Sequence, residues 1–308
     1  MKRFIVRLAA VLLPFIGIVL GISVFSYRME WRVLENDLRC LPEIRAVVVG
    51  DSRAEVYWDP SVIPWLRNCG QSATPFQITA KKAKMLVELN PHLELVVIDI
   101  WPSKLFDSNT PFHPSAPAGV SLLEVTDRHS MPPLGDDFPI RFVNGVLKPA
   151  LQHVRSPIRS RKSSIAGGFF KNHKFLRENK WSREETYARH EMFQLRNTPL
   201  YMESVLEDLL SWMKDRDVNV VLTTTPIYHW WWEYYYSKEA QKYFTRRVQE
   251  IADKYDVKWY NWMHEYQDEI DYWADGDHLN DVGAKVFSAD KKPILENHLK
   301  GSQERDSH

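Results

Sequence analysis

Short runs rich in β-branched residues alternate along the chain with longer amphipathic runs, and this alternation limits the available folds more than any other feature. The short runs, each typical of a buried strand, are residues 46–50, 93–100, 218–224 and 257–260. The helical patterns are residues 76–89, 200–214, 238–255 and about 280–298, the last with Pro293 as a candidate kink. Strands that alternate with helices form a parallel sheet covered on both faces. We therefore expect an α/β fold, a three-layer α/β/α sandwich around a central parallel sheet.

Residues 1–27 predict an N-terminal transmembrane helix. An uncharged apolar stretch from Leu8 to Phe25 follows three basic residues and has about the length that crosses a bilayer. Basic residues before such a stretch favour an inside N-terminus and an exported remainder. A cleaved signal peptide and a buried helix of a soluble protein are the alternatives, but the run is long for a signal peptide and no A-x-A site follows it. We expect an uncleaved anchor in the cytoplasmic membrane, with the rest of the chain on the extracytoplasmic side.

The remainder divides into one large domain and a short tail. Residues 28–300 contain all the predicted strands and the other helices, interrupted at about 103–199 by a segment rich in proline with little periodicity. We interpret this segment as a long insertion or lid. Residues 301–308, with the sequence GSQERDSH, predict a disordered tail.

Charge and cysteine content exclude several kinds of partner and cofactor. Lys+Arg and Asp+Glu both number 40, so the chain has no basic excess with which to bind nucleic acid. Cys40 and Cys69 are too few for a zinc site or a disulfide framework. In an exported protein they would form one disulfide or remain small buried thiols, and the sequence leaves both alternatives open. No metal or other cofactor is predicted.

A candidate nucleophile follows the first predicted strand, in Gly50-Asp51-Ser52-Arg53. Parallel sheets bind ligands beyond the carboxyl ends of their strands. Glycine permits a tight turn from strand to helix, and a serine there is exposed with its backbone N–H at a helix N-terminus. That N–H can stabilise an oxyanion, so Ser52 is a candidate for attack on an acyl group. The alternative is that Asp51 or Ser52 only caps the helix.

A candidate base lies near the other end of the chain, in Asp275-Gly276-Asp277-His278. A serine nucleophile needs a base, usually imidazole, and the imidazole needs a carboxylate to orient it. Asp275 lies three residues before His278, a spacing that lets a loop bring the two side chains together. Asp277 is adjacent to His278 and is expected to point elsewhere. The alternative is an acidic turn that caps the last helix, with His278 on the surface.

Together the two motifs resemble those of the SGNH hydrolases, also called the GDSL esterase/lipase superfamily. That family has a Gly-Asp-Ser motif after its first strand and an Asp-x-x-His motif before its last helix. Here these are Gly50-Asp51-Ser52 and Asp275-x-x-His278, and the latter continues as HLNDVGAKVFS, a sequence typical of that block. The resemblance extends from about residue 45 to residue 299. It implies an SGNH-type, flavodoxin-like sandwich with Ser52, Asp275 and His278 as the catalytic triad.

The same resemblance implies where an oxyanion would be bound. The backbone N–H of Ser52 and that of Gly70, in the segment Asn68-Cys69-Gly70-Gln71-Ser72, are the expected donors. The family usually adds an asparagine from a Gly-x-Asn-Asp motif after the third strand, but here the strand runs into Trp101-Pro102 without it. Loss of one such donor costs about 100- to 1,000-fold in rate. Efficient general hydrolysis is therefore not expected.

Membrane-anchored relatives without this third motif look like the proteins that transfer D-alanine to teichoic acid or acetylate exopolysaccharides. This likeness implies O-acyl transfer or ester hydrolysis on a cell-envelope glycan or polymer, beside a multi-pass membrane O-acyltransferase. The alternatives are a stand-alone carbohydrate esterase, a lipase or thioesterase, and a non-catalytic scaffolding or binding subunit that retains the fold. The sequence does not identify the acyl group or the acceptor.

Overall fold

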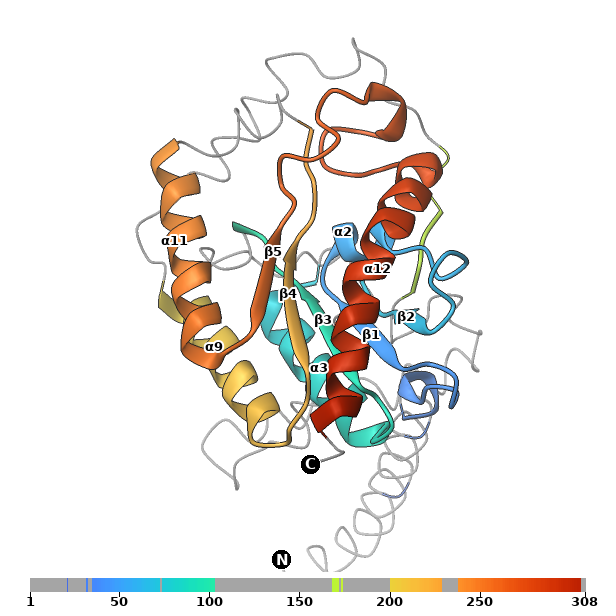
Figure 1. The fold of residues 1–308 in the computed structure, drawn as a ribbon, viewed down its shortest axis with the longest axis vertical. Coiled ribbons are helices and arrows are strands. Elements are labelled where there is room, and N and C mark those ends of the chain that lie inside the picture. The colour runs from blue at the N-terminus through green and yellow to red at the C-terminus, as the bar shows by residue number, and fades with distance from the viewer. Residues whose placement is uncertain are drawn as a thin grey trace, which may run out of the picture. The chain divides into compact units, whose positions relative to one another are not determined.

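The computed structural model describes residues 35–72, 74–102, 168–171, 173, 200–228 and 238–305, together with Gly21 and Arg32. The chain divides into two compact units. The unit formed by residues 38–119 and 166–308 contains the sheet and the candidate site (Figure 1). The other unit, residues 1–37 and 120–165, is described at only a few positions.

The described strands form a five-stranded parallel sheet in the order β2-β1-β3-β4-β5. They are β1 (Ala46–Val49), β2 (Leu66–Asn68), β3 (Leu95–Asp99), β4 (Val220–Thr224) and β5 (Lys258–Asn261). The prediction of an α/β fold with a parallel sheet is confirmed. This strand order is the flavodoxin-like one among doubly wound sheets.

Helices cover both faces of this sheet. The helices are α2 (Ser52–Tyr57), α3 (Phe76–Leu89), α9 (Leu200–Lys214), α11 (Lys238–Tyr255) and α12 (Asp281–Arg305), with a short 3-10 helix η2 (Ile270–Tyr272). In Figure 1, α12 crosses in front of the strands and α3 lies behind them. Successive strand residues point to opposite faces. Val48 and Val97 accordingly belong to the same buried cluster as Phe287 of α12, while their neighbours Val47 and Val96 are buried on the other face.

The predicted element boundaries agree with the structure over most of this unit. Helices α3, α9 and α11 have the predicted bounds. Strands β1, β3 and β4 are one to three residues shorter than the runs that predicted them, and β5 is shifted by one residue. Helix α12 continues through Pro293 to Arg305, five residues into the predicted disordered tail. A helix that is already nucleated gains one hydrogen bond per added residue, which favours this extension. Residues 306–308 lie outside the described part.

The candidate site lies where the strand order changes direction. From β1 the chain continues to β2 on one side, whereas β3 pairs with the opposite side of β1. The loops that follow β1 and β3 therefore diverge at their carboxyl ends, where sheets of this kind bind ligands. Ser52 directly follows β1, so the topology positions it at this switch point.

Two predictions fall mainly on residues that the structure does not describe. The predicted anchor, residues 1–27, is described only at Gly21, and the predicted insertion, 103–199, only at 168–171 and 173. Within the described ranges, no helix has the length and apolar character needed to cross a bilayer. Cys40 is half-buried and Cys69 is buried, and no disulfide joins them.

Candidate active site

The turn after β1 presents Ser52 as the first residue of α2. The side chain of Asp51 accepts a hydrogen bond from Arg53 N at 3.0 Å, so Asp51 is the cap of this helix. A side chain at Gly50 would lie 2.6 Å from Ala54 Cβ and 2.9 Å from Asp99 Cβ, which explains the need for glycine. As the first helical residue, Ser52 has a backbone N–H without an intrahelical acceptor. Its hydroxyl, not needed for capping, is available for other contacts.

The loop before α12 folds back on itself and presents His278. Ala274 N donates to His278 O at 2.9 Å, and Trp273 and Leu279 form an antiparallel bridge. Asn280, fully buried, caps α12 by accepting hydrogen bonds at 3.0 Å from the N–H groups of the second and third helical residues. The loop is thus fixed at both ends, which restricts the position of the imidazole.

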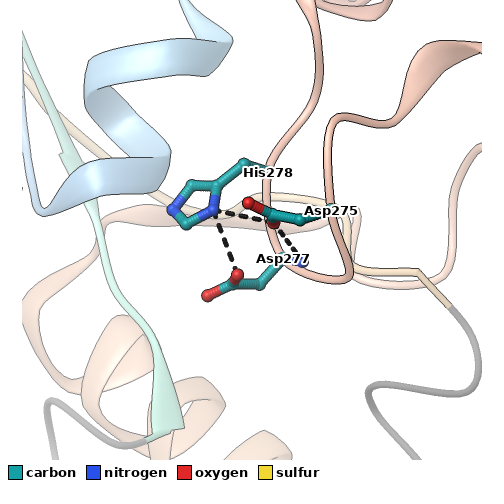
Figure 2. Close-up of side chains that lie close together, drawn as sticks. All are labelled: Asp275, Asp277 and His278. Carbon is teal, nitrogen blue, oxygen red and sulfur yellow. Dashed lines mark hydrogen bonds and ion pairs between the residues drawn. The ribbon is translucent and has the colours of Figure 1, made fainter. Parts of the chain in front are cut away.

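The structure brings together the three residues predicted to form the triad. Ser52 Oγ lies 2.8 Å from His278 Nε2, across 226 residues of sequence. His278 Nδ1 lies 2.9 Å from Asp275 Oδ1, as Figure 2 shows. The His278 side chain is 21% exposed, so the relay is accessible from solvent at one edge. This arrangement allows a proton to pass from the serine hydroxyl to an imidazole that a carboxylate orients.

Asp277 also contacts the imidazole, which corrects the expectation that it points elsewhere. Its Oδ1 lies 3.0 Å from His278 Nδ1, on the same side of the ring as Asp275 (Figure 2). The reason is the tightness of the turn, in which Asp277 N donates to Asp275 Oδ1 at 3.0 Å. The hydroxyl of Tyr57 donates to Asp277 O at 3.2 Å and helps to hold this backbone. Two carboxylates therefore face one ring nitrogen.

These carboxylates dominate the electrostatics of the histidine. Burial alone would lower the pKa of His278, but Asp277 and Asp275 outweigh burial and hold that pKa well above its usual value. Burial would raise the pKa of Asp277, but His278 and Arg53 hold it well below the usual range. The two carboxylates therefore favour the protonated form of the imidazole over the neutral form. Ser52 acquires a working base when this imidazolium loses its proton.

A buried arginine lies beneath the two motifs. Arg53, 4% exposed, contacts Asp51 Oδ2 at 2.9 Å and Asp277 Oδ2 at 3.6 Å. Its guanidinium carbon lies 3.7 Å from the centre of the ring of Trp101, which follows β3 by two residues. Burial and the Asp51 carboxylate raise the pKa of the nearby Asp99 to about 8. Apart from the position of Arg53 directly after the serine, no sequence pattern predicted this cluster.

Gly70 does not offer the N–H that the resemblance implied. That N–H donates to Asn68 Oδ1 at 2.8 Å, in the local turn that asparagine side chains often make with the backbone two residues on. Glycine is needed here for packing, since a Cβ would lie 2.2 Å from Glu55 N and 2.6 Å from Ala54 C on α2. Of the two predicted oxyanion donors, the Ser52 N–H alone remains compatible with that role.

Part of the predicted insertion returns to this edge of the sheet. Gly168 N donates to Gly70 O at 3.1 Å, and Phe170 N donates to Glu55 O at 3.0 Å. His173 Nδ1 lies 3.1 Å from Asp281 Oδ2, at the start of α12. Two of the residues contacted, Glu55 and Asp281, are close in sequence to Ser52 and to His278 respectively, so this short segment borders the site. The sequence had no pattern that identified these contacts.

The same side chains would also provide a set of metal ligands. Asp275, Asp277 and His278 each offer one ligand atom, and these atoms lie within 4.8 Å of one another. The distances of 2.9 and 3.0 Å from Nδ1 to the carboxylates are nevertheless those of charge-assisted hydrogen bonds.

Comparisons with known proteins give likenesses to solved structures only. No protein-family model matches the chain, and no curated protein matches it in sequence. A crystal structure from Bacteroides fragilis, of a protein provisionally assigned as an acylhydrolase, is similar with a TM-score of 0.41 and 12% sequence identity. The match covers 83% of this chain and 88% of that one.

Proposed function

We propose that this protein is a serine-dependent acyl-transferring enzyme, an esterase or O-acyltransferase of the SGNH type. The observation that supports this proposal most strongly is the continuous relay from Ser52 Oγ through His278 to Asp275, with distances of 2.8 and 2.9 Å. Ser52 and the Asp275–His278 loop come from distant parts of the chain and meet in the order that nucleophilic catalysis requires. They meet at the switch point of a parallel sheet, the usual ligand site of such folds.

The proposed reaction has two acyl-transfer steps. Ser52 Oγ attacks the carbonyl carbon of an ester or thioester while its proton passes to His278 Nε2. The tetrahedral intermediate places negative charge on the carbonyl oxygen, near the Ser52 N–H. Its collapse breaks the bond to the leaving alcohol or thiol, which takes the proton from His278. A second hydroxyl, or water, then loses its proton to His278 and takes the acyl group from Ser52, and His278 returns that proton to Ser52 Oγ as the bond to the acyl group breaks.

We further propose that the acceptor is a hydroxyl of a cell-envelope glycan or polymer. Support comes from the predicted anchor at residues 1–27 and from the missing third motif, where Trp101 stacks on Arg53. With the Gly70 N–H engaged by Asn68, few oxyanion donors remain, and this slows acyl transfer to water and to a hydroxyl alike. In this proposal a multi-pass membrane O-acyltransferase supplies the acyl group on the extracytoplasmic side.

The same shortage of oxyanion donors supports one alternative, a scaffolding subunit that retains the fold and recruits a partner enzyme. A second alternative is a stand-alone carbohydrate esterase, with water as the acceptor. The scaffold and the esterase differ in whether Ser52 reacts with an ester. A lipase or thioesterase would use the same relay on a different acyl donor.

Turnover of a chromogenic acetyl ester by the full chain in detergent tests the proposal. We expect slow release of the chromophore that is lost in Ser52→Ala and in His278→Ala, and that a chelator does not change. Adding an acetylatable oligosaccharide should increase release if transfer is preferred to hydrolysis. Release that Ser52→Ala leaves intact would rule out this nucleophile, and absence of any release would favour the scaffold.

A further inference from the structure

Asp277 bridges the candidate base and a buried cation. One carboxylate oxygen, Oδ1, lies 3.0 Å from His278 Nδ1, and the other, Oδ2, lies 3.6 Å from Arg53 Nη1. Asp275 Oδ1 lies 2.9 Å from the same ring nitrogen and accepts the Asp277 N–H. A triad needs only one carboxylate at this nitrogen. The second carboxylate, with its own cation, has no part in the reaction as written above.

Arg53 is fixed independently of the histidine. Its Nη2 lies 2.9 Å from Asp51 Oδ2, its guanidinium stacks on Trp101, and its side chain is 5% exposed. It also directly follows Ser52 on α2. The residue that follows the nucleophile therefore contacts a carboxylate of the base loop. This links the positions of the two motifs more directly than the sheet alone.

We propose that Asp277 is a second orienting carboxylate of His278, and that Arg53 is the positioning residue that holds it there. The inference rests on the proposed function, because it assigns these roles within the same relay. In this arrangement His278 Nδ1–H keeps an acceptor when either carboxylate is lost. The orientation of the base toward Ser52 then survives single substitutions that would disable an ordinary triad.

Other charged groups face this pair and shape its charge balance. Glu55 of α2 interacts electrostatically with His278, and Tyr57 of α2 with both aspartates. Asp99 of β3 interacts electrostatically with both Asp51 and Arg53. Arg53 is a cation among these acidic groups, and Lys82 acts on Glu55, so the two cations offset part of the effect of the acidic groups on the imidazolium. Asp277 adds to that effect, so its removal should let His278 lose its proton at lower pH.

The first test is a double-mutant cycle on the full chain, with hydrolysis of the chromogenic acetyl ester as the readout. We expect Asp275→Asn to lower kcat/KM by about tenfold and Asp275→Asn/Asp277→Asn by about 10,000-fold, the loss seen when a triad histidine has no carboxylate. Asp277→Asn alone should shift the midpoint of the pH–rate profile to lower pH. A loss in Asp275→Asn as large as in the double variant would overturn the proposal.

The second test concerns Arg53. Lysine keeps the charge but lacks the fork that contacts Asp51 and Asp277 together. We expect Arg53→Lys to lower kcat/KM further in the Asp275→Asn background, and to have little further effect once Asp277 is also Asn. An equal effect in both backgrounds would make Arg53 a purely structural residue. Arg247→Lys, which alters the ion pair with Glu203 between α11 and α9, is the matched control and should leave the rate unchanged.

A spectroscopic readout separates this inference from the proposed function. In protein labelled with ¹⁵N-histidine, the Nδ1–H signal of His278 is identified by its loss in His278→Ala. We expect it to persist in Asp275→Asn and in Asp277→Asn, and to disappear in the double variant. That pattern in a protein whose Ser52 never reacts with a fluorophosphonate would support the inference and refute the function. Labelling of Ser52 together with loss of the His278 signal in Asp275→Asn would support the proposed function and refute the inference about Asp277.

Discussion

Two groups of ion pairs in this molecule have similar chemistry and opposite surroundings. At the switch point, Arg53 pairs with Asp51 where both side chains are less than 10% exposed. On the outer helices, Lys254 of α11 pairs with Glu207 of α9 at 2.9 Å, and Arg246 pairs with Glu250 within α11 at 3.7 Å. There the cations are 57% and 65% exposed. Burying a charge is costly unless it is fully paired, whereas exposed pairs contribute little. The buried ion pairs around Arg53 are therefore better explained by a function than by a contribution to stability.

The largest expected difference between the two regions is in catalysis. His278→Ala removes the base and should lower kcat/KM for the chromogenic ester by about 10,000-fold or more. Lys254→Gln on α11 removes an exposed charge far from the relay and should leave kcat/KM within experimental error. Equal effects of the two substitutions would show that the relay does not perform the reaction.

The next difference is in stability. Arg53→Gln leaves Asp51 and Asp277 without their shared cation, so the free energy of unfolding should fall by about 3–5 kcal/mol. Arg246→Gln, which disrupts an exposed pair with Glu250, should cost less than about 1 kcal/mol. Urea unfolding followed by tryptophan fluorescence measures both. Similar losses in the two variants would remove the distinction between buried and surface charge.

Two glycines at the border of the site extend the comparison to packing. Gly70→Ala places a Cβ within 3 Å of backbone atoms of α2, so we expect a loss of about 1–3 kcal/mol. Gly168→Ala meets nothing within 4 Å and should change stability by less than about 0.5 kcal/mol. The same urea experiment applies. A neutral Gly70→Ala would mean that β2 and α2 approach less closely than described.

Over a single pH unit, the smallest expected effect is a pH dependence of stability that comes from a buried carboxyl group. The pKa of Asp99 is about 8, above its unfolded value, so the folded state binds more protons between these two pKa values. Stability should therefore fall as pH rises from about 4 to 8, by about 1 kcal/mol per pH unit. Asp99→Asn should remove this slope, and Glu207→Gln on α9 should not. Urea unfolding at pH 5 and 6, below the range in which the raised pKa of His278 affects stability, distinguishes them.

The parts of the fold that the sequence predicted well are those with strong periodicity. Helices α3, α9 and α11 combine a regular apolar stripe with clear end signals, such as Asn90-Pro91 after α3. Strand β2 was not predicted as an element because Leu66–Asn68 is only three residues long and contains an arginine. Helix α2 is likewise too short, at six residues, for a periodic signal.

For the site, the sequence predicted the three residues of the relay but not what surrounds them. Spacing suggested that Asp275 approaches His278, because a turn of three residues brings such side chains together. The same argument failed for Asp277, whose carboxylate is turned toward the ring by the backbone hydrogen bond to Asp275. The role of Asn68 in engaging the Gly70 N–H depends on a local turn that no motif encodes. Long-range contacts such as Arg53 with Asp277 leave no trace in spacing.

The most direct test of the central claim is the intact mass of the full chain after reaction with a fluorophosphonate. If Ser52 is the activated nucleophile, one phosphonyl group is added to the wild-type chain, peptide mapping assigns it to Ser52, and Ser52→Ala and His278→Ala remain unmodified. The Arg247→Lys variant should react as the wild type does. An unmodified wild-type chain, or modification that persists in Ser52→Ala, would contradict the account.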